Sequence, residues 1–76
     1  MKVQILKEEI KIKVRRDDKL KLQLAETNNI KVASVDRWLR EDNVMLTTVT
    51  NLQLIREYFS LPESDELTEE KEHEAA

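Results

Sequence analysis

The stretch Leu22–Arg40, with the sequence LQLAETNNIKVASVDRWLR, decides the fold because it predicts two helices separated by a short turn. Its only strong break signal is Asn-Asn at 28–29, and asparagine is the non-glycine residue that most readily adopts a left-handed backbone conformation. Past the turn, Val35 lies three residues before Trp38 and four before Leu39, so these apolar side chains share one helical face. The stretch therefore predicts a helix-turn-helix arrangement with Trp38 in the core.

The first of these helices is expected over about 19–28 and the second over about 32–41. Asp17-Asp18 offers an N-cap for the first helix, because a carboxylate there can accept from the exposed amides at the helix start. Further upstream, apolar residues recur at helical spacing at Val3, Leu6, Ile10 and Val14. We predict a helix over about 3–16 from them. Residues 10–14, IKIKV, also alternate as a strand does, so a strand is the alternative there.

The sequence after residue 46 predicts two more helices and a tail. Thr47 or Thr48 can cap a helix that runs through residue 60, with an inner face made by Leu52, Ile55 and Phe59. Pro62 can occupy the first turn of a last short helix over 63–67. Residues 68–76, TEEKEHEAA, have no apolar content worth burying, and we predict that they form a disordered acidic tail.

The composition favours helices and excludes several classes of site. The chain has 76 residues and neither cysteine nor glycine. These absences exclude a disulfide framework, a thiolate metal site, a Gly-rich phosphate loop and a dinucleotide-binding fingerprint. We therefore predict an all-α domain of four or five helices over residues 1–67. Because no apolar run is long enough for a bilayer and the N-terminus is not a signal peptide, we expect a cytoplasmic protein without membrane contact.

The charges are distributed unevenly along the chain. Residues 1–60 hold twelve Lys or Arg against nine Asp or Glu, whereas residues 61–76 hold one Lys and seven acidic residues. The net charge of −3 thus describes a mildly basic body with an acidic tail. The body is compatible with a polyanionic partner. The tail is compatible with a basic protein partner, although a role in solubility alone also accounts for it.

These patterns together resemble the Cro/CI-type repressors, the lambda-repressor-like helix-turn-helix family found in phage repressors and related bacterial regulators. In the helix pair, the resemblance rests on Leu24-Ala25, the turn ending at Ile30, Val35 and Arg37-Trp38. Downstream it rests on Leu46-Thr47-Thr48, Leu52, Ile55, Leu61-Pro62 and Asp65-Glu66-Leu67. It covers roughly residues 5–67. It implies sequence-specific binding of double-stranded DNA in transcriptional regulation, with residues 32–40 as the recognition helix.

The resemblance also implies which residues touch the duplex. Base contacts are implied for Lys31, Val32, Ala33, Asp36 and Arg37. Arg37 is the first candidate, because a guanidinium can bond bidentately to guanine O6 and N7. Phosphate contacts are implied for Lys19, Lys21, Gln23 and Arg40. The family further implies a homodimer that reads two half-sites about 34–36 Å apart, and the expected contributors to its interface are Leu54, Tyr58 and Leu61.

The chain departs from the family pattern at three positions. Asn28 stands where the family has an apolar residue, Asn29 replaces the turn glycine, and Lys31 stands where Ser or Thr normally caps the recognition helix. These departures, together with the acidic Asp36 on the outer face, keep an alternative open. In it the helix-turn-helix is a protein-interaction module of antirepressor, adaptor or antitoxin type that does not bind DNA. RNA binding is a weaker alternative, since the chain has only three aromatic residues.

Catalysis is not expected. His73 is the only histidine, and it lies in the predicted tail, where a flexible segment cannot hold the geometry of a metal site. The acidic pairs at 8–9, 17–18 and 41–42 are adjacent in sequence, so on a helix their members point in different directions. We therefore predict no enzymatic activity, no metal and no cofactor.

Overall fold

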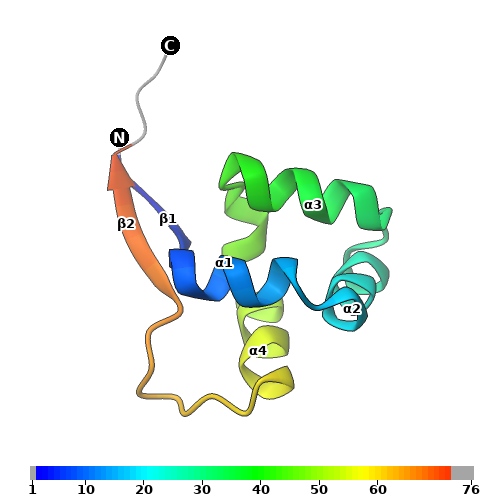
Figure 1. Cartoon of the computed structure of the whole chain (residues 1–76). Coiled ribbons are helices and arrows are strands. Elements are labelled where there is room, and N and C mark those ends of the chain that lie inside the picture. Colours follow the sequence, from blue (N-terminus) through cyan, green and yellow to red (C-terminus); the bar gives the residue numbers. More distant parts are fainter. Residues whose placement is uncertain (1, 73–76) are drawn as a thin grey trace.

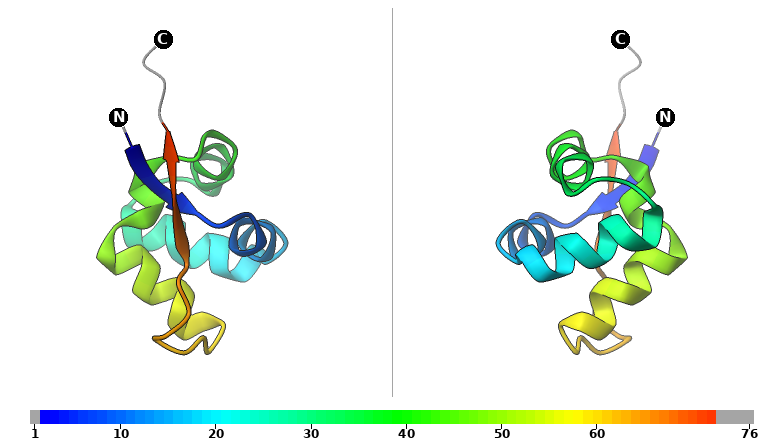
Figure 2. Two further views of the ribbon diagram at one scale, coloured as in Figure 1. Left: turned by 90° about the vertical axis from the view of Figure 1, so that its left-hand side faces the viewer. Right: turned by 90° about the vertical axis from the view of Figure 1, so that its right-hand side faces the viewer.

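Four helices and a two-stranded antiparallel sheet make up the fold in the computed structural model, which describes residues 2–72 (Figure 1). In chain order the elements are β1 (Lys2–Leu6), α1 (Glu8–Arg15), α2 (Asp18–Asn28), α3 (Val32–Glu41), the short 3-10 helix η1 (Val44–Thr47), α4 (Val49–Tyr58) and β2 (Thr68–Glu72). Figures 1 and 2 show the two strands side by side, next to the helices. The prediction of an all-α domain is therefore wrong, and the fold is mixed α and β.

The N-terminal strand replaces the first part of the helix predicted over 3–16. The chain is extended through Lys7, and α1 begins only at Glu8. In α1 the alternating residues 10–14 are helical, with Ile10 and Val14 buried one turn apart and Ile12 partly exposed. The extended conformation of residues 2–6 is stabilised by backbone hydrogen bonds to β2, which the local sequence cannot reveal.

The C-terminal strand corrects two further predictions. Residues 68–72, predicted to be disordered, pair with β1 in a register that runs from Leu6 opposite Thr68 to Lys2 opposite Glu72. No helix forms over 63–67, where the chain makes a turn before Leu67 enters the core. The Leu67 carbonyl accepts from the Lys7 amide at 2.9 Å, which anchors the start of β2. The remainder of the predicted tail, from residue 73 on, lies outside the described residues.

A single apolar core joins the helices to the sheet. Its buried members are Leu6, Ile10, Val14, Leu20, Leu24, Ala25, Val35, Leu39, Leu46, Ile55 and Leu67. The predicted helices over 19–28 and 32–41 and the helix capped by Thr48 are confirmed. Trp38, predicted in the core, is half-buried and packs against this cluster. Within residues 2–72, no helix is long and apolar enough to cross a membrane.

Candidate nucleic-acid interface

The turn between α2 and α3 has the geometry that its asparagines predict. Asn29 adopts the left-handed conformation, with φ 55° and ψ 47°. The Ile30 amide donates to the Ala25 carbonyl at 2.9 Å and the Asn29 amide to the Glu26 carbonyl at 3.2 Å, so two carbonyls of the last turn of α2 are satisfied. Asn29 thus does what a glycine does at the end of many helices, and this departure from the family pattern costs little.

The side chain of Asn28 is hydrogen-bonded to a second asparagine, Asn51, which the sequence did not indicate as its partner. Asn28 Nδ2 donates to the Leu24 carbonyl at 2.7 Å and to Asn51 Oδ1 at 2.9 Å. Asn51, fully buried in α4, donates back to Asn28 Oδ1 at 3.2 Å and to the Met45 carbonyl at 2.7 Å. All four side-chain N–H groups of the pair are therefore used. The pair fixes the end of α2 to α4 and η1, and nothing in the local pattern signals it.

The outer face of α3 carries the residues predicted to touch bases. Asp36 and Arg37 each lie three or four residues from Ala33 and from Arg40, so the four residues form one stripe, which we call the α3 stripe. Ala33 and both arginines are exposed, whereas Val35 and Leu39 on the opposite face are buried. Neither arginine forms an ion pair with any side chain of residues 2–72. Figure 1 shows α3 along one side of the molecule.

Two predicted base contacts lie at the start of α3 and differ in exposure. Lys31 is exposed and precedes the helix without a side-chain capping hydrogen bond, as expected for a side chain with no acceptor. Val32 is half-buried and packs against the core. The structure therefore brings Lys31 to the surface near the α3 stripe, whereas Val32 serves mainly in packing.

The side chain of Lys21, a residue of α2, lies between α2 and α3. A phosphate contact would instead reach outward. The Lys21 side chain is only 11% exposed, and its Nζ lies 3.1 Å from Asp36 Oδ1 and 3.3 Å from Asp18 Oδ1. The hydrogen bond to Asp36 outweighs the effect of burial and raises the pKa of Lys21 above its ordinary value. Lys21 therefore stays charged and compensates the negative charge of Asp36. The other phosphate candidates of α2, Lys19 and Gln23, are exposed.

The residues expected at a dimer interface are already engaged with the core. Leu54, Tyr58 and Leu61 are half-buried and pack against the apolar cluster. The Tyr58 hydroxyl also donates to Asp17 Oδ1 at 2.8 Å. The Leu20 amide, followed by this hydroxyl, lowers the pKa of Asp17. Of the two predicted cap residues, Asp17-Asp18, Asp17 is the one whose carboxylate caps α2. Tyr58 thus joins the end of α4 to the start of α2.

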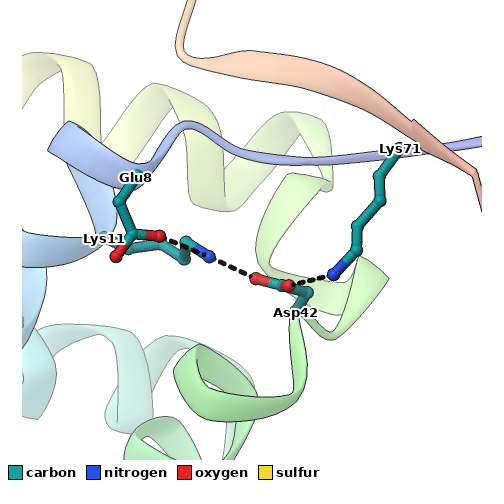
Figure 3. Close-up of polar contacts among 4 residues, drawn as sticks. All are labelled: Glu8, Lys11, Asp42 and Lys71. Atoms are coloured by element: carbon teal, nitrogen blue, oxygen red, sulfur yellow. Dashed lines mark hydrogen bonds and ion pairs between the residues drawn. The ribbon is translucent and has the colours of Figure 1, made fainter.

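A charged cluster ties the end of α3 to α1 and β2 (Figure 3). Asp42 ends α3 with a left-handed backbone, at φ 52°, and its side chain is 16% exposed. Its Oδ1 lies 2.6 Å from Lys11 Nζ in α1 and its Oδ2 lies 2.9 Å from Lys71 Nζ in β2. Lys11 also pairs with Glu8 at 3.0 Å. Burial on its own raises the pKa of Asp42, but hydrogen bonds from the two lysines outweigh it and hold that pKa below its ordinary 3.8.

Asp42→Asn is expected to lower the free energy of unfolding at neutral pH by about 1–2 kcal/mol. Asparagine tolerates the left-handed backbone, but it cannot form ion pairs with the two lysines. Because the folded-state pKa of Asp42 lies below its unfolded value, its contribution is complete above a pH of about 4 and is lost as the pH falls through the folded-state pKa. Asp17, whose pKa is also lowered, is present in both wild type and Asp42→Asn, so its contribution cancels in the stability difference.

Urea denaturation of both chains at pH 7 and at pH 2–3 checks this expectation. The stability difference between wild type and Asp42→Asn should shrink on acidification. A difference that stays constant over this range would contradict a charged role for Asp42.

Comparison of the chain with protein-family models, with curated proteins and with solved structures found no match in any of the three. Arguments about function therefore depend on the residues of this chain and their geometry. Within residues 2–72, no three His, Cys, Asp or Glu side chains are grouped so as to hold a metal ion. His73, considered above as a metal ligand, lies outside the described residues.

Proposed function

We propose that the protein is a transcriptional regulator of the Cro/CI type that binds double-stranded DNA sequence-specifically, with α3 in the major groove. The observation that carries the proposal is the α3 stripe, where Arg37 and Arg40 are exposed and have no acidic partner within residues 2–72. The major groove is wide enough for a helix, and an arginine suits both guanine edges and phosphates. Arg37 is assigned to a base edge and Arg40 to a phosphate.

Residues around the α3 stripe fill supporting roles in this proposal. Lys31 lies at the start of α3, and exposed Lys19 and Gln23 on α2 fix the register by phosphate contacts. Lys21 is assigned to Asp36 and no longer to phosphate. The net charge of −3 comes from residues 61–76, whereas residues 1–60, which include α2 and α3, hold twelve basic against nine acidic residues.

The proposal includes a homodimer in the cytoplasm that reads two half-sites about 34–36 Å apart. Because Leu54, Tyr58 and Leu61 pack against the core, other apolar residues are better candidates for contact with a second copy of the chain. Three exposed apolar residues follow α3 in sequence, namely Val44 and Met45 in η1 and Val49 in α4. Val49 is 81% exposed.

Selection of bound duplexes from a randomised library, using the full chain at moderate salt, tests the proposal. An enriched motif that repeats at helical-turn spacing supports a dimeric DNA reader. The affinity for this motif should fall with salt, with a slope of about −0.9 in log–log form per phosphate neutralised. Failure to enrich any motif contradicts DNA recognition and favours the alternative of a protein-interaction module.

Arg37→Ala is expected to reduce discrimination at one base position by roughly 1–3 kcal/mol, or about 5- to 150-fold, because the variant loses a bidentate guanine contact. Competition binding with duplexes that differ only at that position measures the effect. Arg56→Ala, which removes the same charge from α4, is the control and should leave base preferences unchanged. If both variants lose the same discrimination at that position, Arg37 contributes only its positive charge and makes no specific base contact.

A further inference from the structure

We infer that Asp36, held in position by Lys21, makes α3 select cytosine at one position of the bound duplex. The inference rests on the proposed function and specifies which base edge the site accepts. Asp36 is the acidic residue of the α3 stripe, and its carboxylate would by itself repel the phosphates of DNA. The geometry of the pair gives this carboxylate a defined position and a defined preference.

The position of Asp36 is set by a nearly buried lysine. Lys21 Nζ is 3.1 Å from Asp36 Oδ1, and Asp18 Oδ1, at 3.3 Å, holds the same ammonium from the start of α2. Because the Lys21 side chain is enclosed between the two helices, it anchors one oxygen of Asp36 and restricts rotation of the carboxylate. The second oxygen, Oδ2, accepts no hydrogen bond from residues 2–72. The side chain is 45% exposed, so this oxygen is available as a fixed acceptor on the α3 stripe.

The charge of Asp36 is compensated locally. Lys21 is charged and touches the carboxylate, and Arg37 and Arg40 lie one and four residues further along α3. A duplex that approaches α3 therefore meets a carboxylate already paired with a cation and flanked by two more. The repulsion from phosphates is reduced, while the acceptor character of Oδ2 is retained.

An ionised carboxylate can only accept hydrogen bonds, and this restricts the base edges it tolerates. In the major groove, guanine presents N7 and O6 and thymine presents O4, all of them acceptors that Asp36 repels. Adenine offers the N6 amine but places the acceptor N7 beside it. Cytosine alone offers its N4 amine without a neighbouring acceptor on the same base. Asp36 thus selects cytosine by attraction and rejects the other bases by repulsion.

Asp36→Asn provides the direct test, because an amide has nearly the same shape and can both donate and accept. Wild type should prefer cytosine at one motif position by about 5- to 150-fold over guanine or thymine. Asp36→Asn should reduce this preference to within about threefold and leave the other positions unchanged. Motifs selected by the two chains from the same randomised library, followed by competition binding, give these ratios.

Lys21→Met separates anchoring from phosphate contact. Methionine fills a similar volume without the charge, so the variant removes the anchor of Asp36. We expect a weaker cytosine preference at the same position, with preferences elsewhere retained. If Lys21→Met instead weakens binding to all sequences equally, Lys21 contacts phosphate and the anchoring role is wrong. Circular dichroism of each variant checks that the helices are intact.

The outcomes distinguish this inference from the proposed function. If wild type enriches no motif, DNA recognition fails and the role of Asp36 fails with it. If wild type enriches a motif and Asp36→Asn enriches the same one, DNA recognition stands and only the inference about Asp36 is overturned. Loss of the cytosine preference in Asp36→Asn alone supports both.

Discussion

Asn51→Ala is expected to lower the free energy of unfolding by about 2–4 kcal/mol, a large fraction of the 5–15 kcal/mol typical of small domains. The substitution removes the hydrogen bonds that join Asn51 to Asn28 and to the Met45 carbonyl. It leaves the Met45 carbonyl without this donor, and the Asn28 amide keeps only its hydrogen bond to the Leu24 carbonyl. Each buried polar group that loses its partner costs about 1–3 kcal/mol. Urea denaturation followed by the fluorescence of Trp38, the only tryptophan, measures the change.

Two further variants show whether the loss comes from the asparagine pair. Gln53→Ala alters an exposed residue of the same helix and should change stability by no more than about 0.5 kcal/mol. The double variant Asn28→Ala with Asn51→Ala should lose less than the sum of the two single variants, because either one already breaks the contact. Additive losses, or an Asn51→Ala effect no larger than that of Gln53→Ala, would refute a specific role for the pair.

The parts of the fold that the sequence predicted correctly depend on neighbours in the chain. Asp17 and Thr48 cap their helices by accepting from amides three residues ahead. Asn29 takes the left-handed conformation because of its own side-chain type. The inner faces of α2, α3 and α4 follow from spacings of three and four residues. Such interactions are visible in a short window of sequence, so the helix pair could be predicted closely.

The parts that were missed depend on partners far apart in the chain. Lys21 and Asp36 are separated by 15 residues, Asn28 and Asn51 by 23, and Lys11 and Asp42 by 31. A lysine or asparagine on its own predicts exposure, and only the partner makes burial favourable. For the candidate site, the resemblance named the residues of the α3 stripe, but nothing in the sequence indicated the anchoring of Asp36 by Lys21.

The two strands depend most clearly on partners far apart in the chain. Residues 68–72, TEEKE, have neither apolar alternation nor β-branched side chains beyond Thr68, and their side chains are largely exposed. They form a strand because β1, at the other end of the sequence, supplies the backbone partner. Only β1 has buried apolar residues, Ile5 and Leu6, and its short segment also fits a helical pattern. Local pattern alone therefore favoured a helix at one end and disorder at the other.

Removal of β2 is expected to have a large effect on stability. A chain that ends at Leu67 should lose about 2–4 kcal/mol of unfolding free energy relative to a chain that ends at Glu72. Without β2, β1 has no strand partner among the described residues and its backbone groups return to water. Ile5 and Leu6, each no more than 5% exposed, then lose part of their burial, which is worth roughly 1.5–3 kcal/mol for a full side chain. Urea denaturation of the two chains gives the difference.

Hydrogen exchange and one point variant identify the cause of that loss. In the chain that ends at Glu72, the amides of β1 that bond to β2 should be protected, and in the chain that ends at Leu67 they should exchange as fast as exposed amides. Lys71→Ala in the longer chain removes only the contact with Asp42 and should cost about 1 kcal/mol or less, since the lysine is more than half exposed. Equal stability of the two truncated chains would contradict the sheet and return residues 68–72 to the disordered tail. A loss well beyond that of Lys71→Ala, with loss of protection in β1, assigns the stabilisation to pairing of the two ends of the chain.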